Sequence, residues 1–182
     1  MRFSGNGDEK AFEEIYDRYA GRLFTYFCRM LRNDRNKAED FVQDLFAKIV
    51  HRPEVYNTER PFKTWLFSVA NNMCKNEYRR LEVRKNSNYS LDNGMEVPAG
   101  GGIEAEQQFD YSVFNAALQQ ALNGLKDRQR EAFVMRYDQE LSIKEIAAVF
   151  DCSEGTIKSR LFYTLRKLSV ELKEFKPNEI LR

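Results

Sequence analysis

Residues 141–168 read LSIKEIAAVFDCSEGTIKSRLFYTLRKL, a pattern that predicts two helices joined by a turn. Ser142 and Glu145 have the three-residue spacing of a capping box, which starts a helix. That helix is short, because a three-residue turn begins at Asp151, and Ser153 is placed to cap a second helix. Asp tolerates the left-handed conformation of such a turn better than most residues do. A short helix, a tight turn and a second amphipathic helix form the helix-turn-helix arrangement, whose second helix enters the major groove of DNA.

The second helix of this pair carries a basic face that contains no acid. Its apolar residues, from Ile157 to Leu168, share one side, and residues 155–170 include Lys and Arg but neither Asp nor Glu. Such a helix suits a position between two phosphate strands, where cations contact phosphates or guanine edges. Phe162 lies on the side expected to face solvent, where a thymine methyl group would suit it. The alternative is an ordinary helical hairpin with a solvated basic face.

The first half of the chain also has a helical pattern. Apolar residues recur at three- and four-residue steps through residues 12–31, 36–50 and 61–81, as they do in amphipathic helices. Leucines ahead of residue 126 continue this pattern in the second half. Strand-type alternation is not sustained anywhere, so we predict an all-α chain.

Charge and turn-forming residues divide the chain. Its 182 residues carry 29 Lys plus Arg and 28 Asp plus Glu, a net charge of +1. Residues 86–125 hold five acids and no base, and the first part of this stretch is rich in Gly, Asn and Ser. Such a stretch cannot bury enough apolar surface to offset its ordering entropy. We expect two small helical domains, at 1–85 and 111–182, joined by a flexible acidic linker at 86–110. A long functional loop inside one domain is the alternative.

Composition disfavours several classes of protein. The sequence lacks the run of about 18 apolar residues that a membrane span needs, and its first residues do not form a secretory signal. The three cysteines lie far apart without a CxxC pair, so we expect neither a metal site nor disulfides, and a cytoplasmic location. With His51 as its one histidine and no phosphate-binding Gly loop, the chain is not expected to be an enzyme or to need a cofactor.

Two features of residues 38–80 exceed what helix packing requires. Asp40, Gln43 and Asp44 form one acidic edge of a helix, for which ordinary solvation is the alternative interpretation. After residue 61, aromatic side chains alternate with amides and cations, the combination that stacks on bases and neutralises phosphates of single-stranded nucleic acid. Trp65 and its apolar neighbours fit a core position better than a contact with a base.

Together these features resemble the extracytoplasmic-function group of bacterial RNA polymerase sigma factors. The resemblance covers about residues 7–82 and 115–172. The segments that carry it are GDEKAFEEIY at 7–16, AEDFVQDLF at 38–46, FKTWL at 62–66, RE at 130–131, SIKEIA at 142–147 and GTIKSRL at 155–161. It implies two helical modules, sigma regions two and four, in a promoter-specificity subunit without catalysis of its own.

The resemblance also implies partners and site residues. The partners are promoter DNA, an anti-sigma factor, and core RNA polymerase through the flap and the clamp of its largest subunit. The residues expected to dock on the polymerase are Asp40, Gln43, Asp44 and Phe46. Those expected to recognise and melt the minus-ten element are Lys63, Trp65, Asn71, Asn72, Lys75, Asn76, Arg79 and Arg80. Those expected to read the minus-thirty-five element as duplex are Ser153, Thr156, Lys158, Ser159, Arg160, Phe162, Tyr163 and Arg166.

A stand-alone helix-turn-helix regulator is the competing hypothesis. In such a protein the N-terminal domain would serve dimerisation or ligand sensing. A regulator needs neither the acidic edge nor the segment that contains Trp65. Residues 38–80 are therefore the part of the sequence that separates the two hypotheses.

Overall fold

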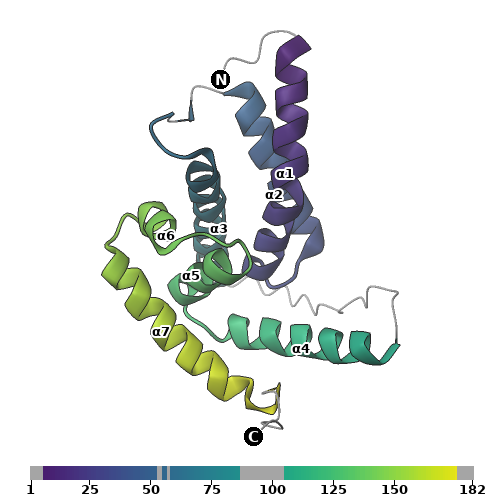
Figure 1. Ribbon diagram of the computed structural model, residues 1–182, viewed down its shortest axis with the longest axis vertical. Helices are drawn as coiled ribbons and strands as arrows, with labels where there is room; N and C mark the ends of the chain where they lie inside the picture. The colour runs from purple at the N-terminus through teal and green to yellow at the C-terminus, as the bar shows by residue number, and fades with distance from the viewer. Residues whose placement is uncertain (1–5, 53–54, 57, 87–104, 176–182) are drawn as a thin grey trace, which may run out of the picture.

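The computed structural model describes residues 6–52, 55–56, 58–86 and 105–175 (Figure 1). The helices are, in order, α1 (Asn6–Met30), α2 (Arg35–His51), α3 (Phe62–Asn86), α4 (Ala105–Asn123), α5 (Asp127–Tyr137), α6 (Ile143–Phe150) and α7 (Glu154–Glu171), followed by a 3₁₀ turn, η2 (Lys173–Phe175). These ranges contain no strand, which agrees with the all-α prediction.

The N-terminal domain consists of α1, α2 and α3. The chain reverses direction after α1 through Arg32 and Asn33, which have positive φ angles of 57° and 65°. Asp34 then caps α2, because its side chain accepts a hydrogen bond from the Lys37 N–H at 3.0 Å. α2 packs along α1, and α3 contacts both helices. Their apolar faces form a core with buried phenylalanines such as Phe27 and Phe67.

The C-terminal domain consists of α4 to α7 and contains the predicted helix-turn-helix. The capping box is present: the Glu145 N–H donates to Ser142 Oγ at 3.2 Å, and the Ser142 N–H donates to Glu145 Oε2 at 2.7 Å. Asp151 adopts the left-handed conformation with φ 52° and ψ 56°, and Ser153 caps α7. Each cap contributes about 1 kcal/mol to helix stability, so local sequence fixes both ends of this turn.

Two helix ends differ from the sequence prediction. α3 continues to Asn86, and α4 already begins at Ala105, inside the range assigned to the linker. Both extensions lack an amphipathic stripe but contain good helix formers, such as Arg84 and Lys85 in the first and the residues Ala-Glu-Gln-Gln at 105–108 in the second. The apolar pattern therefore predicted helices that are too short, because it ends where the buried part of each helix ends. The remaining linker residues, 87–104, lie outside the described residues.

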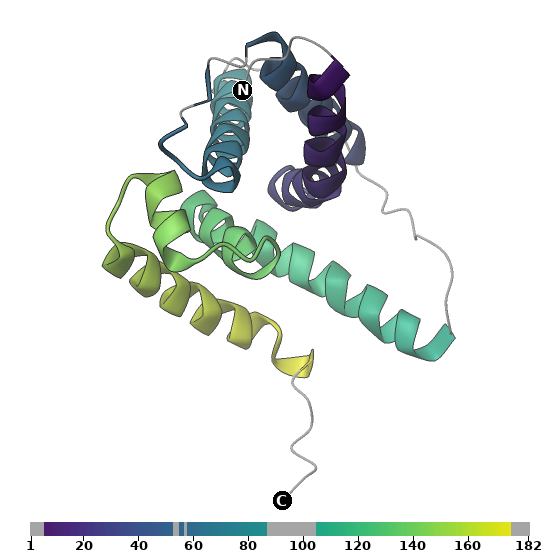
Figure 2. The same cartoon turned by 45° about the horizontal axis from the view of Figure 1, so that its top comes forward.

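The two domains pack against one another as two layers. Figure 2 shows the purple and blue helices of the first domain above the green and yellow helices of the second. α3 lies on α6, and α1 lies on α5. The second domain therefore covers one side of α3, the helix for which the sequence predicts DNA contacts.

Candidate nucleic-acid and polymerase interfaces

The exposed side of α7 combines cations with an aromatic pair. Phe162 and Tyr163 are 61% and 58% exposed, and their rings meet edge-to-face with centroids 5.4 Å apart. Lys158, Ser159 and Arg166 are exposed on the same helix. On the opposite side Ile157, Leu161 and Leu168 are buried, as the helical period predicts. We call the five exposed residues the reading face.

Three other residues predicted to contact the minus-thirty-five element have local structural contacts. Ser153 Oγ accepts from the Thr156 N–H at 3.2 Å and lies 2.9 Å from the Thr156 hydroxyl, so both side chains cap α7. The Arg160 guanidinium lies half-buried over the Phe150 ring, 5.2 Å from its centroid. Its Nη1 has no hydrogen-bond partner among the described residues. Arg160 thus joins α7 to α6 and is not part of the reading face.

The residues predicted to recognise the minus-ten element lie on two sides of α3. The exposed side carries Asn72, Asn76, Arg79 and Arg80. Arg80 also pairs with the Glu77 carboxylate at 2.9 Å. We call these four exposed residues the outer face of α3. The other predicted residues, Lys63, Trp65, Asn71 and Lys75, are half-buried or buried.

Trp65 belongs to an aromatic group at the start of α3. Its ring lies 5.1 Å from that of Tyr56 and 5.7 Å from that of Phe62, measured between centroids. Tyr19 on α1 completes the group, with its ring 5.6 Å from that of Phe62. Trp65 is half-buried, so it packs within the domain and is partly accessible. The sequence pointed to Trp65 and Phe62, but Tyr56 precedes the helix and gave no signal.

The predicted polymerase-docking residues divide in the same way. Asp40, Gln43 and Asp44 are exposed on α2 and form the expected acidic edge. Phe46 is only 3% exposed, and its ring packs 4.8 Å from that of Tyr16 and 5.9 Å from that of Phe12. Its assignment as a docking residue is therefore corrected. Phe46 lies on the apolar side of α2 and holds that helix against α1.

The sequence matches two family models in the order of the two domains. Residues 15–84 match Sigma-70 region 2, and residues 115–168 match Sigma-70, region 4. The ECF RNA polymerase sigma factor SigL of Mycobacterium tuberculosis is 34% identical over 161 residues, 88% of each chain. The ECF RNA polymerase sigma factor SigW of Bacillus subtilis is 28% identical over 174 residues, 92% of each chain. The chain belongs to the extracytoplasmic-function sigma factors.

A solved sigma factor has a similar three-dimensional structure. The sigma factor RpoE of Bartonella quintana, determined in complex with the anti-sigma factor NepR, is 26% identical with a TM-score of 0.71. The match covers 92% of this chain and 99% of that one. The N-terminal domain of the present sigma factor is thus region two, the C-terminal domain is region four, and the chain is a promoter-specificity subunit of RNA polymerase.

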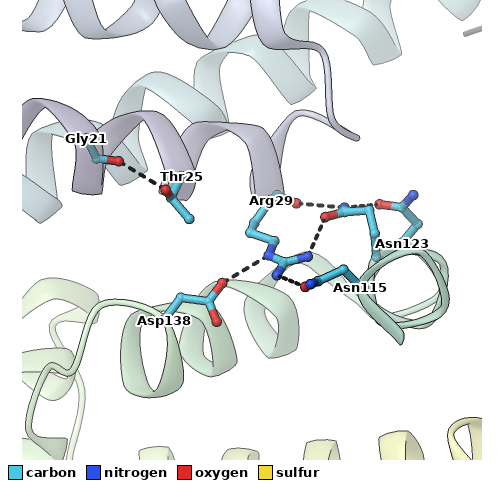
Figure 3. Close-up of polar contacts among 7 residues, drawn as sticks. Gly21, Thr25, Arg29, Asn115, Asn123 and Asp138 are labelled. Atoms are coloured by element: carbon cyan, nitrogen blue, oxygen red, sulfur yellow. Dashed lines mark hydrogen bonds and ion pairs between the residues drawn. The ribbon is translucent and has the colours of Figure 1, made fainter. Parts of the chain in front are cut away.

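The turn between α5 and α6, together with α4, forms one of the contacts between region four and region two of this sigma factor. Arg29 Nε pairs with Asp138 Oδ2 at 3.1 Å, and its other nitrogens donate to Gln119 and Asn115 on α4 (Figure 3). On the same side of α1, the Arg22 guanidinium donates to the backbone carbonyl of Gln139. The turn therefore carries acceptors that face two arginines of region two.

Lys63 and Asn71 of region two are held by region four as well. Lys63 Nζ donates to the Glu140 carbonyl at 3.2 Å, and burial lowers the pKa of Lys63. Asn71 is fully buried. With its amide nitrogen turned toward α5, Asn71 donates to Glu131 Oε1 at 3.2 Å and accepts from Lys75 Nζ at 3.2 Å. The sequence predicted Lys63, Asn71 and Lys75 to contact DNA, but here they contact region four or lie beneath it.

Glu131 lies at the centre of this buried group. It is 1% exposed, and Arg128 approaches its carboxylate to 3.6 Å. Burial raises the pKa of Glu131 to about 7, against the lowering effect of Arg128 and Lys75. Beside it the Arg130 guanidinium lies 5.4 Å from the centroid of the Tyr78 ring on α3. No sequence pattern predicted these contacts between α5 and α3, because the residues that form them are far apart along the chain.

The described residues give no sign of a metal centre or a membrane span. Within those ranges no group of three or more His, Cys, Asp or Glu side chains could hold a metal ion. No helix in the described part of the chain is long and apolar enough to cross a bilayer. Cys28 and Cys74 are buried, and burial raises the pKa of both thiols.

Proposed function

We propose that this sigma factor initiates transcription through three separate surfaces. The acidic edge of α2 docks on the polymerase, the outer face of α3 binds the minus-ten element, and the reading face of α7 binds the minus-thirty-five element. The observation that carries the proposal is the reading face, a capped helix whose exposed side joins cations to an aromatic pair. A face of this composition matches phosphates, base edges and thymine methyl groups in the major groove.

The outer face of α3 and the aromatic group support the proposed melting of the minus-ten element. Extruding a base from the stack costs a few kcal/mol, which stacking on an aromatic side chain and hydrogen bonds to an amide can offset. Trp65 supplies the stacking surface, while Asn72 and Asn76 supply amides. Arg79 and Arg80 lie further along the same helix and neutralise phosphates of the displaced strand.

Docking is assigned to Asp40, Gln43 and Asp44 without Phe46. Their side chains project from one exposed edge, and two of them are carboxylates that attract a basic surface. We propose that this partner surface is the clamp of the largest polymerase subunit, and that the sigma factor acts in the cytoplasm, where polymerase and promoter meet. We propose no catalytic step for the chain, consistent with the role of sigma factors as non-enzymatic initiation factors.

The stand-alone regulator is not favoured, because residues 15–84 match Sigma-70 region 2, which such a regulator does not need. An anti-sigma factor is proposed as the regulator of this chain, since the similar sigma factor from Bartonella quintana was solved with one. Transcription with core polymerase from the source organism tests the proposal. We expect discrete start sites on genomic DNA that depend on the added chain. A complete absence of such transcripts would refute it.

Docking is tested by replacing Asp40, Gln43 and Asp44 together with Ala. All three are exposed, so we expect an unchanged thermal midpoint, and loss of two carboxylates from the contact should weaken core-polymerase binding roughly tenfold. The affinity is measured by titrating labelled sigma factor with core polymerase. A double variant of α1, Glu13→Ala with Glu14→Ala, removes the same charge from another exposed helix and should bind normally. Equal affinities for both variants would refute the docking assignment.

A further inference from the structure

A group of cations surrounds Phe150, the last residue of α6. That helix lies against α3, α5 and α7 (Figure 1), and each of these three helices contributes one cation. The guanidinium carbons of Arg128 and Arg160 each lie 5.2 Å from the centroid of the Phe150 ring, and Lys75 Nζ lies 5.9 Å from it. We call Lys75, Arg128 and Arg160 the Phe150 cations. Residues from both domains therefore form one positively charged group.

The Phe150 cations have little negative charge to balance them. Glu131 is the one carboxylate in the described part of the chain that pairs with any of them, at 3.6 Å from Arg128. Burial raises the pKa of Glu131 to about 7, so near neutral pH this carboxylate carries only part of its charge. The group as a whole therefore keeps an excess of positive charge.

The hydrogen bonds of these cations are incomplete as well. Arg160 Nη1 is buried and has no hydrogen-bond partner among the described residues. A buried donor without an acceptor costs about 1–3 kcal/mol, and in a native protein it points to a bound ion or water. The Phe150 ring compensates only in part, because a cation–π contact near the surface contributes about 0.5–1 kcal/mol. Burial, together with the charge of Arg128, lowers the pKa of Lys75, as expected for a cation held beside other cations.

A phosphate group has the chemistry that such a cluster needs. Phosphate oxygens accept charge-assisted hydrogen bonds from ammonium and guanidinium groups, and arginine can bind them through two parallel N–H donors. Arg128 is exposed, whereas Lys75 and Arg160 are half-buried, so the group is open to solvent on one side and partly shielded from water on the other. Ion contacts in such a partly buried place are screened less by salt than contacts on an open surface.

We propose that the Phe150 cations form a binding site for a phosphate-bearing small molecule, of the class of diphosphates and nucleotides. A phosphate of the DNA backbone offers the same oxygens. However, the group lies on the side of α7 that packs against α6, and its cations belong neither to the reading face nor to the outer face of α3. A compact free ligand therefore fits this place better than a rigid duplex does, and the site is additional to the three surfaces of the proposed function.

Titration calorimetry of the isolated full chain with inorganic pyrophosphate tests the site. We expect one saturable site whose affinity falls as the concentration of NaCl rises, because the contact is between charges. Arg128→Gln and Arg160→Gln should each weaken this binding about tenfold. Lys144→Gln removes a cation from the exposed start of α6 and should bind like the parent chain. No saturable binding at millimolar pyrophosphate, or the same affinity in all four chains, would overturn the proposal.

Glu131→Gln separates an anion site from a group of cations that only packs the helices. Glutamine keeps a side-chain oxygen for Asn71 but removes the carboxylate that competes with the ligand for Arg128. We therefore expect this variant to bind pyrophosphate about threefold more tightly than the parent chain does. Circular dichroism of every variant verifies that the chain remains folded. Weaker binding by a folded Glu131→Gln chain would overturn the proposal.

Binding to a labelled DNA duplex of random sequence separates the two sources of phosphate. For a free ligand, Arg128→Gln should bind the duplex like the parent chain while its affinity for pyrophosphate falls. An equal loss of duplex and pyrophosphate binding in this variant would assign the site to the DNA backbone and overturn the assignment to a free ligand.

Discussion

Phe162 and Tyr163 expose more apolar surface than any structural role in α7 requires. Their rings contact each other, and both side chains are more than half exposed. Burial of aromatic surface is a major source of binding free energy. Within the reading face, this pair would therefore contribute most binding free energy on contact with a base edge. In the proposed function, the cations beside it would attract any DNA, while the aromatic pair would add selectivity.

Phe162→Ala should therefore weaken minus-thirty-five recognition without unfolding the domain. We expect a loss of about 1 kcal/mol, or roughly fivefold in affinity, confined to promoters with a thymine at the contacted step. Binding of the holoenzyme to duplex promoter fragments, with and without that thymine, measures the effect. Val170→Ala, which truncates another exposed apolar residue of α7, should leave the affinity unchanged. A uniform loss across all fragments would contradict a base-specific role.

At the scale of single residues, the sequence predicted exposure well only for a helix that is covered on one side. The reading face follows from the period of α7. Ile157, Leu161 and Leu168 are buried as expected, whereas Leu165, expected on the same side, is 42% exposed. Phe46 and Asn71 lie on sides of α2 and α3 that another helix covers. A helical period shows that a residue belongs to a face, but it does not show how many partners that face has. The burial of these two residues against α1 and α5 could not be predicted for this reason.

At the scale of the element, the helix-turn-helix was predictable because its signals are local. The capping box, the left-handed turn residue and the second cap each depend on a few consecutive residues. Contacts between α3 and α5 depend instead on which surfaces meet after both domains have formed. The fold within each domain was therefore readable from the sequence, and the arrangement of the domains was not.

The backbone of Asp151 is mildly strained in the turn between α6 and α7. Its φ angle of 52° lies in the left-handed region, where a side chain costs about 1 kcal/mol relative to glycine. Asp151→Gly should therefore raise the free energy of unfolding by about 0.5–1 kcal/mol, as measured by urea denaturation. Asp151→Ala lacks both the freedom of glycine and the local hydrogen bonding of aspartate, so it should lower the stability. Equal stability of the two variants would show that the turn relaxes.

At the scale of the whole molecule, the packing of region four on region two should depend on pH through Glu131. We call the chain closed when α1 and α3 pack against α5 and α6, and open when the two domains are apart. Burial raises its pKa to about 7 in the closed chain, whereas an exposed glutamate titrates near 4.3. The closed chain therefore holds a proton that the open chain releases between these values. This contribution to closure is complete at low pH and is lost as the pH rises through 7. The charged and titratable groups that face Glu131 are Lys75 and Cys74 on α3, Tyr26 on α1, and Asp127, Arg128 and Arg130 on α5.

The distance between two dyes measures this dependence, with the dyes attached at Ala47→Cys on α2 and Val170→Cys on α7 in a chain that also carries Cys152→Ser. We expect a larger open fraction at pH 8 than at pH 6, with little further change above pH 8. Glu131→Gln carries no charge to bury, so it should remain closed at both values and lose the dependence in this range. If the parent chain gives the same distance at both values, or if Glu131→Gln retains the dependence, another group is responsible.

Asn71 has a structural role here and a predicted role on DNA. In the structure it hydrogen-bonds Glu131 of region four and Lys75 of region two, and the sequence predicts that it recognises the minus-ten element. A substitution at this position that alters promoter preference would therefore also alter the packing of the two domains. Promoter preference and domain packing would then be linked at this one position of α3.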